Sequence, residues 1–148
     1  MHRRWLLLGC AGVAWLGACG AGDETLPSAC TDRAGVERAL ARAPDEVTLG
    51  DGTRLSACLR AATTAADLQT LGATLTAVAA DLERAADGDP VSAGRLGYLI
   101  GASRRGIEGS SGTAAELAHR LERSGAGVSD PASATALRQG LAAGETSG

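Results

Sequence analysis

The 148-residue sequence has very few aromatic side chains. It contains no Phe, and its two Trp residues lie within the first 15 positions, so Tyr98 is the only Phe, Tyr or Trp in the remainder. Ala supplies 31 residues, so the hydrophobic content of 45% overstates the large side chains available to fill a core. This shortage excludes a core built on aromatic residues and favours a small, thinly packed helical domain, because Ala has the highest helix propensity.

Lysine and asparagine are also absent, and all 14 Lys or Arg positions are arginines. Against them stand 17 acidic residues, and the longest basic run is the pair Arg104-Arg105. Nucleic-acid binding requires a basic patch or stripe that neutralises phosphates, which a chain of net charge −3 without such a run does not provide. We therefore expect no nucleic acid as a partner.

Common catalytic and metal-binding motifs are missing as well. The chain has neither a Gly-x-Ser-x-Gly nucleophile elbow nor a Cys-x-x-Cys pair. Glu116 and His119 form one Glu-x-x-His pair, whereas a di-iron helical bundle uses two such pairs together with two further Glu residues. We therefore expect no metal, no cofactor and no enzymatic activity.

The stretch from Thr64 to Asp87 predicts one long amphipathic helix. Thr64 followed by Asp67 approximates a capping box at its start, and Gly88 before Asp89-Pro90 ends it. Its apolar residues recur at three- and four-residue steps, which places them on one side of a helix: Leu68, Leu71, Leu75, Val78, Leu82 and Ala85. We expect the rest of the chain to cover this apolar stripe.

Three further helices complete a predicted all-α bundle of about four helices in a domain that covers residues 28–124. They are expected over 31–43, over 90–105 and over 113–124. Thr113 and Glu116 approximate a second capping box.

Residues 47–55 surround an Asp-Gly dipeptide and predict a short β-hairpin or turn. Residues 125–148 are expected to form a linker, a weak C-terminal helix from Pro131 and a frayed tail, and the sequence does not decide whether that helix packs on the core. Three glycines on one face of the helix over 90–105 are expected to approach the long helix closely, because a helical Gly is costly unless its missing side chain serves packing: Gly94, Gly97 and Gly101.

Residues 1–18 have the organisation of an export signal. Arg3 and Arg4 give a basic start, and an apolar run of 14 residues extends from Trp5 to Ala18. This run is shorter than the roughly 20 residues that a membrane-spanning helix needs. We therefore predict a secretory signal peptide.

The residues around the expected cleavage point, Leu16-Gly17-Ala18-Cys19, resemble the lipobox of bacterial lipoproteins. The resemblance implies that cleavage precedes Cys19, that its thiol carries a diacylglyceryl group, and that the protein is anchored in the cell membrane or outer membrane, facing outside the cytoplasm. Residues 19–27 then form a flexible tether with an r.m.s. reach of about 15 Å. An ordinary cleaved signal and an uncleaved membrane anchor are the alternative interpretations.

Export also predicts the state of the remaining cysteines. Cys10 would leave with the signal and Cys19 would carry lipid, which leaves Cys30 and Cys58 in an oxidising compartment. A disulfide between them is favoured over two free thiols, and it would stabilise the fold by about 3 to 4 kcal/mol in the chain-entropy account.

These observations predict a non-catalytic lipoprotein whose helical domain is an interaction or structural module of the cell envelope. Its expected partners are the membrane, reached through Cys19, and an envelope protein. The alternative function is binding of a small ligand in a pocket between helices, lined by Tyr98, Arg104, Arg105 and His119. Catalysis is the more remote alternative.

Overall fold

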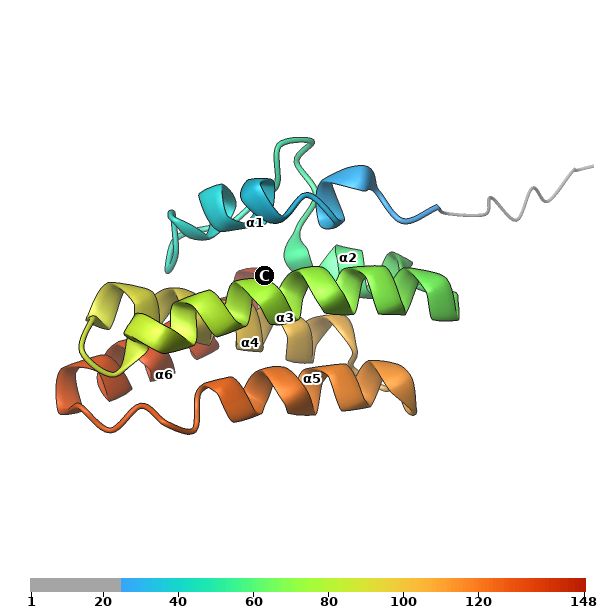
Figure 1. Cartoon of the computed structure of the whole chain (residues 1–148). Coiled ribbons are helices and arrows are strands. Elements are labelled where there is room, and N and C mark those ends of the chain that lie inside the picture. Colours follow the sequence, from blue (N-terminus) through green and yellow to red (C-terminus); the bar gives the residue numbers. More distant parts are fainter. Residues whose placement is uncertain (1–24) are drawn as a thin grey trace, which may run out of the picture.

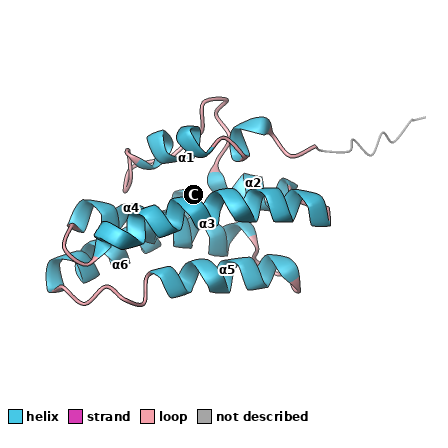
Figure 2. Ribbon diagram, in the orientation of Figure 1, coloured by secondary structure: helices cyan, strands magenta, loops and turns pink. Residues whose placement is uncertain are grey.

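The computed structural model describes residues 25–148, so the predicted signal peptide and Cys19 lie outside the described residues. Within this part, a short 3-10 helix, η1 (Ser28–Cys30), precedes six α-helices, and no residue belongs to a β-strand (Figure 2). The α-helices are α1 (Arg33–Leu40), α2 (Leu55–Ala61), α3 (Ala65–Ala86), α4 (Pro90–Gly106), α5 (Thr113–Ser124) and α6 (Pro131–Ser147). The fold is all-α, as predicted, with six helices where about four were expected.

Helix α4 is the central element of the fold. Ten of its 17 residues are buried, including every residue from Leu96 to Ser103, and it contacts all five other α-helices. In Figure 1, α3 crosses in front of it, with α1 above α3 and α5 below. A helix that is buried on all sides is typical of the middle of a core. The long helix α3, whose apolar stripe we expected the rest of the chain to cover, lies on only one side of α4.

The long helix forms as its sequence pattern predicts. Thr64 and Asp67 make a capping box, in which Asp67 N donates to Thr64 Oγ1 over 3.1 Å and Thr64 N donates to Asp67 Oδ2 over 3.3 Å. Leu71, Leu75 and Val78 are buried, whereas Leu68 and Leu82 at the ends of the stripe are half-buried. The apolar stripe therefore packs inward along its middle turns.

One local prediction, the second capping box, is wrong, and of the hairpin or turn expected over residues 47–55 the structure contains the turn. Helix α5 is capped by Gly112, whose carbonyl accepts from Glu116 N over 3.0 Å, so Thr113 already lies in the first turn and makes no capping box. Residues 47–55 form a tight turn with a single antiparallel bridge between Thr48 and Arg54, and not a hairpin of two strands. The turn is held by Asp51 Oδ1, which accepts from Thr53 N over 2.9 Å.

The C-terminal helix, which the sequence pattern does not place in or outside the core, belongs to it. Helix α6 continues to Ser147, and its contact with α4 is the most extensive between any two elements described. Gly148 is buried, and Ser56 Oγ on α2 donates to its carbonyl oxygen. The packed domain therefore extends from η1 to residue 148, beyond the expected limit of 124.

Glycines on both helices make the contact between α4 and α6 possible. A Cβ on Gly97 would overlap the carbonyl oxygen of Leu137, and one on Gly144 would overlap that of Tyr98. Gly140 faces Gly94 in the same way, so residue numbers increase together along the two helices and they run parallel. Gly97 and Gly101 of α4 serve close packing, as predicted, but their partner is α6 and not α3, and a Cβ on Gly94 would make only an ordinary contact with Ala136.

Candidate functional site

Arg104, one of the residues proposed to line a ligand pocket, lies in an ion-pair network at the end of α4. Its Nε lies 2.8 Å from Glu122 Oε1 on α5, and its Nη1 lies 3.0 Å from Glu145 Oε1 on α6. The hydrogen bond from Arg104 lowers the pKa of Glu122, and the bonds to both carboxylates raise the pKa of Arg104. Arg104 thus links three helices, and two of its nitrogens, Nε and Nη1, donate to the protein's own carboxylates.

Arg105 and His119 belong to the same region but have different contacts. Arg105 Nη1 donates to the carbonyl oxygen of Glu145 over 3.0 Å and to that of Thr146, so it caps the last turn of α6. His119 Nδ1 lies 3.2 Å from Glu122 Oε2, and its side chain is 66% exposed. Arg105 therefore interacts with α6, and His119 interacts with a neighbouring residue of its own helix, α5.

Tyr98 is fully buried and lies apart from that surface. Its hydroxyl accepts a hydrogen bond from Val47 N over 3.2 Å and lies 3.2 Å from Ser147 Oγ. It therefore ties α4 to the turn region and to the end of α6. A buried Tyr and an exposed His cannot line one open surface, so the four predicted residues do not converge on a shared pocket.

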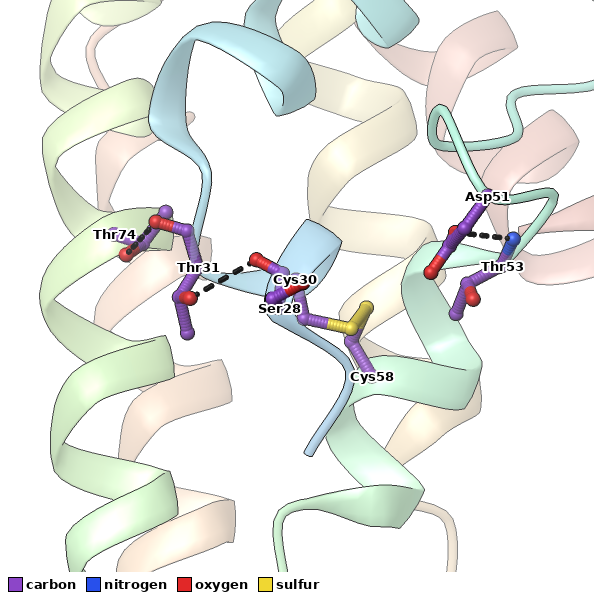
Figure 3. Close-up of a disulfide and its surroundings, with 7 residues drawn as sticks. All are labelled: Ser28, Cys30, Thr31, Asp51, Thr53, Cys58 and Thr74. Carbon is purple, nitrogen blue, oxygen red and sulfur yellow. Dashed lines mark hydrogen bonds between the residues drawn. A yellow bond between two sulfur atoms is a disulfide. The ribbon is translucent and has the colours of Figure 1, made fainter. Parts of the chain in front are cut away.

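Cys30 and Cys58 lie at disulfide distance, as the export argument predicts. Their Cα atoms are 5.6 Å apart, and both residues are fully buried. Figure 3 shows the bridge joining η1 to α2, with Thr31 beside it on the same short segment. Thr31 in turn accepts a hydrogen bond from Thr74 Oγ1 of α3 through its carbonyl oxygen, over 3.5 Å. The first described residues are thereby attached to the helical core.

Surface hollows are the other candidate sites. One of about 560 Å³ contains Arg105, with Arg60 and Glu145 among its other lining residues. Another, about 760 Å³, lies between α1 and the turn and has Arg38 and Arg42 in its lining. A third, about 470 Å³, lies between α3 and α5, with Leu68, Gly72 and Leu117 among its lining residues. A fourth, about 280 Å³, lies between α1, α3 and α4 and includes Arg95, which was not singled out from the sequence.

Within residues 25–148, no three His, Cys, Asp or Glu side chains are grouped so that they could hold a metal ion. None of the described helices combines the length and apolar character that crossing a bilayer requires.

Comparison with known proteins gives no family assignment. No protein-family model, curated protein or solved structure matches this chain.

Proposed function

We propose that the chain is an exported, lipid-anchored protein whose helical domain acts without catalysis as an interaction or structural module of the cell envelope. The observation that carries this proposal is the Leu16-Gly17-Ala18-Cys19 motif after a short apolar run. The buried cysteine pair supports it, because disulfides persist outside the reducing cytosol. Two acyl chains on one cysteine are sufficient for stable anchoring.

The anchor is tested by Cys19→Ser in the full-length chain, expressed in a bacterium that processes lipoproteins. We expect palmitate labelling of the parent protein, and loss of both labelling and signal cleavage in the variant, because the serine hydroxyl does not replace the thiol as lipid acceptor. Cys10→Ser is the matched control and should be labelled like the parent. Unchanged labelling of Cys19→Ser would refute the lipid anchor.

The interaction role is supported by the hollow between α3 and α5, where apolar side chains lie beside exposed polar ones. Ala73 is exposed and lines this hollow, whereas Ala66 is exposed on the same helix outside it. If an envelope protein binds here, Ala73→Glu should weaken crosslinking of the membrane-anchored protein to that partner, while Ala66→Glu leaves it unchanged. Equal crosslinking by both variants would exclude this surface.

A second candidate function is the binding of a small ligand between helices. One observation favours it: Arg95 is half-buried in the hollow between α1, α3 and α4, and its Nε is buried without a hydrogen-bond partner among the described residues.

A further inference from the structure

The hollow that contains Arg95 combines an apolar floor with a charged wall. Leu40 and Val78 are buried, and Leu82 is half-buried. Arg33, Glu37, Asp81 and Arg95 supply the charged side chains around them. Its volume of about 280 Å³ lies at the lower limit of small-molecule sites, which measure roughly 300 to 1,000 Å³. A ligand of this site must therefore be small and partly apolar.

Both carboxylates of the wall are already engaged by other arginines. Arg33 Nε lies 2.8 Å from Glu37 Oε1, and Arg33 also pairs with Asp81. The second oxygen of Asp81 pairs with Arg84. The lining thus holds two arginines, Arg33 and Arg95, and two carboxylates, and Arg95 is the arginine that forms no ion pair within residues 25–148.

The charge of Arg95 also affects the pKa of another acidic residue, Asp89, at the start of α4. Its carboxylate accepts from Val91 N over 3.0 Å and from Ser92 Oγ over 2.6 Å, and these bonds, with a smaller contribution from the charge of Arg95, lower its pKa. Asp89 is therefore committed to capping α4 and makes no ion pair with Arg95.

The Nε of Arg95 is the remaining unusual feature of this cluster. A buried donor without an acceptor is unfavourable, and buried polar groups in proteins are nearly always hydrogen-bonded. The guanidinium group presents its donors in a planar fork that matches a carboxylate. Neither Glu37 nor Asp81 supplies that acceptor, because both pair with Arg33.

We propose that this hollow binds a small monocarboxylate with an apolar group, whose carboxylate pairs with Arg95 and whose apolar part lies on Leu40, Val78 and Leu82. A single negative charge pairs with Arg95, the one arginine of the lining that has no ion-pair partner within residues 25–148. A dianionic phosphate would add a second charge beside Glu37 and Asp81, so a monoanion is favoured. The inference rests on the second candidate function, small-ligand binding, and is independent of the lipid anchor at Cys19.

The test is equilibrium dialysis of the detergent-solubilised full-length protein against labelled benzoate, with a detergent-only control. We expect saturable binding to the parent protein, competed by hexanoate but not by acetate, which has the charge without the apolar group, or by inorganic phosphate. Arg95→Gln should weaken benzoate binding by about tenfold or more, because it removes a charge-assisted interaction. Arg120→Gln, which changes an exposed arginine on α5, should bind benzoate like the parent.

Two further measurements distinguish loss of the binding site from loss of the folded structure. Leu82→Ala removes part of the apolar surface at a half-buried position, so it should weaken benzoate binding. Acetate should still fail to compete with benzoate. Circular dichroism of each variant establishes that it is folded, and Leu82→Ala serves as the test if Arg95→Gln does not fold. Absence of saturable benzoate binding to the parent, or equal binding by folded Arg95→Gln, would overturn the proposal. Tighter competition by phosphate than by hexanoate would overturn the assignment of ligand class.

Discussion

Helix α4 packs against the long helices α3 and α6 on two different faces, and the two contacts are made in opposite ways. The inward face of α3 carries large side chains such as Leu71, Leu75 and Val78, all of them buried. Towards α6, the contact is made by backbone against backbone, with Gly97 and its counterparts providing the space. The first contact removes apolar side chains from water, whereas the second gains dispersion energy and weak Cα–H···O contacts from close approach.

This difference explains how a sequence so poor in large apolar residues forms a core. Small residues bring helix axes close together, so fewer and smaller side chains are needed to fill the space between them. Each helical glycine costs about 1 kcal/mol relative to Ala, and the close packing must offset that cost. Glycine-rich segments in such a sequence can therefore be core elements and not linkers.

The largest loss of stability is expected from a substitution in the buried leucine stripe of α3. Leu75→Ala removes a fully buried side chain from the face of α3 and should lower the free energy of unfolding by about 2 to 5 kcal/mol, measured by urea denaturation. Leu68→Ala, at a half-buried position of the same stripe, is the matched control and should cost less. Equal losses at the two positions would contradict the packing of α3 described above.

The glycine contact between α4 and α6 is tested by the same change, Gly to Ala, at two positions of α4. Gly97→Ala places a Cβ about 2.9 Å from the carbonyl carbon of Leu137, and closer still to its oxygen, so the helices must separate. We expect a loss of about 1 to 3 kcal/mol from this overpacking. Gly94→Ala places its Cβ 3.7 Å from the nearest atom, an ordinary contact, and should be neutral or stabilise by up to about 1 kcal/mol through helix propensity.

Opposite signs from the same change on one helix face would establish that local approach, and not helix propensity, decides the outcome. Gly144→Ala on α6 should reproduce the loss seen with Gly97→Ala, because its Cβ would overlap Tyr98 from the other side. A gain in stability from Gly97→Ala and Gly144→Ala together would rule out the close contact between α4 and α6.

Much of the fold was readable from local signals. The capping box at Thr64, the prolines at positions 90 and 131 and the leucine stripe all mark features that the structure contains. The placement of α6 was not readable from hydropathy, because its buried residues are Ser133, Gly140 and Gly144, while its leucines are only partly buried. The four-residue spacing of the two glycines, continued by Gly148, is the signal that would have indicated a helix face for close approach.

The candidate sites were less accessible from sequence for a different reason. Arg104 and Arg105 were singled out correctly as a polar group, but their acceptors lie on α5 and α6, and only the fold brings these together. Arg95 could have been noticed, because it is a charged residue within the apolar stretch of a helix that is otherwise buried. Pairing in three dimensions decides which arginines are satisfied, and sequence spacing does not contain that information.

The smallest expected effect concerns the ionic contacts that accompany the glycine packing. The backbone contact between α4 and α6 involves no titrating atom, so acid should act on the domain through carboxylates such as Glu122. Arg104 lowers the folded-state pKa of Glu122 below its ordinary value of 4.5. A lowered pKa contributes stability that is present above the unfolded-state value and is lost as pH falls through the folded-state value.

We therefore expect the contribution of Glu122 to be constant from pH 7 to about pH 5 and to disappear at lower pH. Because Arg104 is 41% exposed, the contribution should be less than about 1 kcal/mol. Glu122→Gln should remove it, so that the free energies of unfolding of the parent and variant differ at pH 7 and converge as the pH falls through the folded-state pKa of Glu122. Glu116→Gln on the same helix, where Arg123 is 3.7 Å away, is the control and should differ less from the parent at pH 7. Convergence on raising the pH, instead of lowering it, would contradict the assigned direction of the Glu122 pKa and the role of Arg104 in fastening α5 to α4.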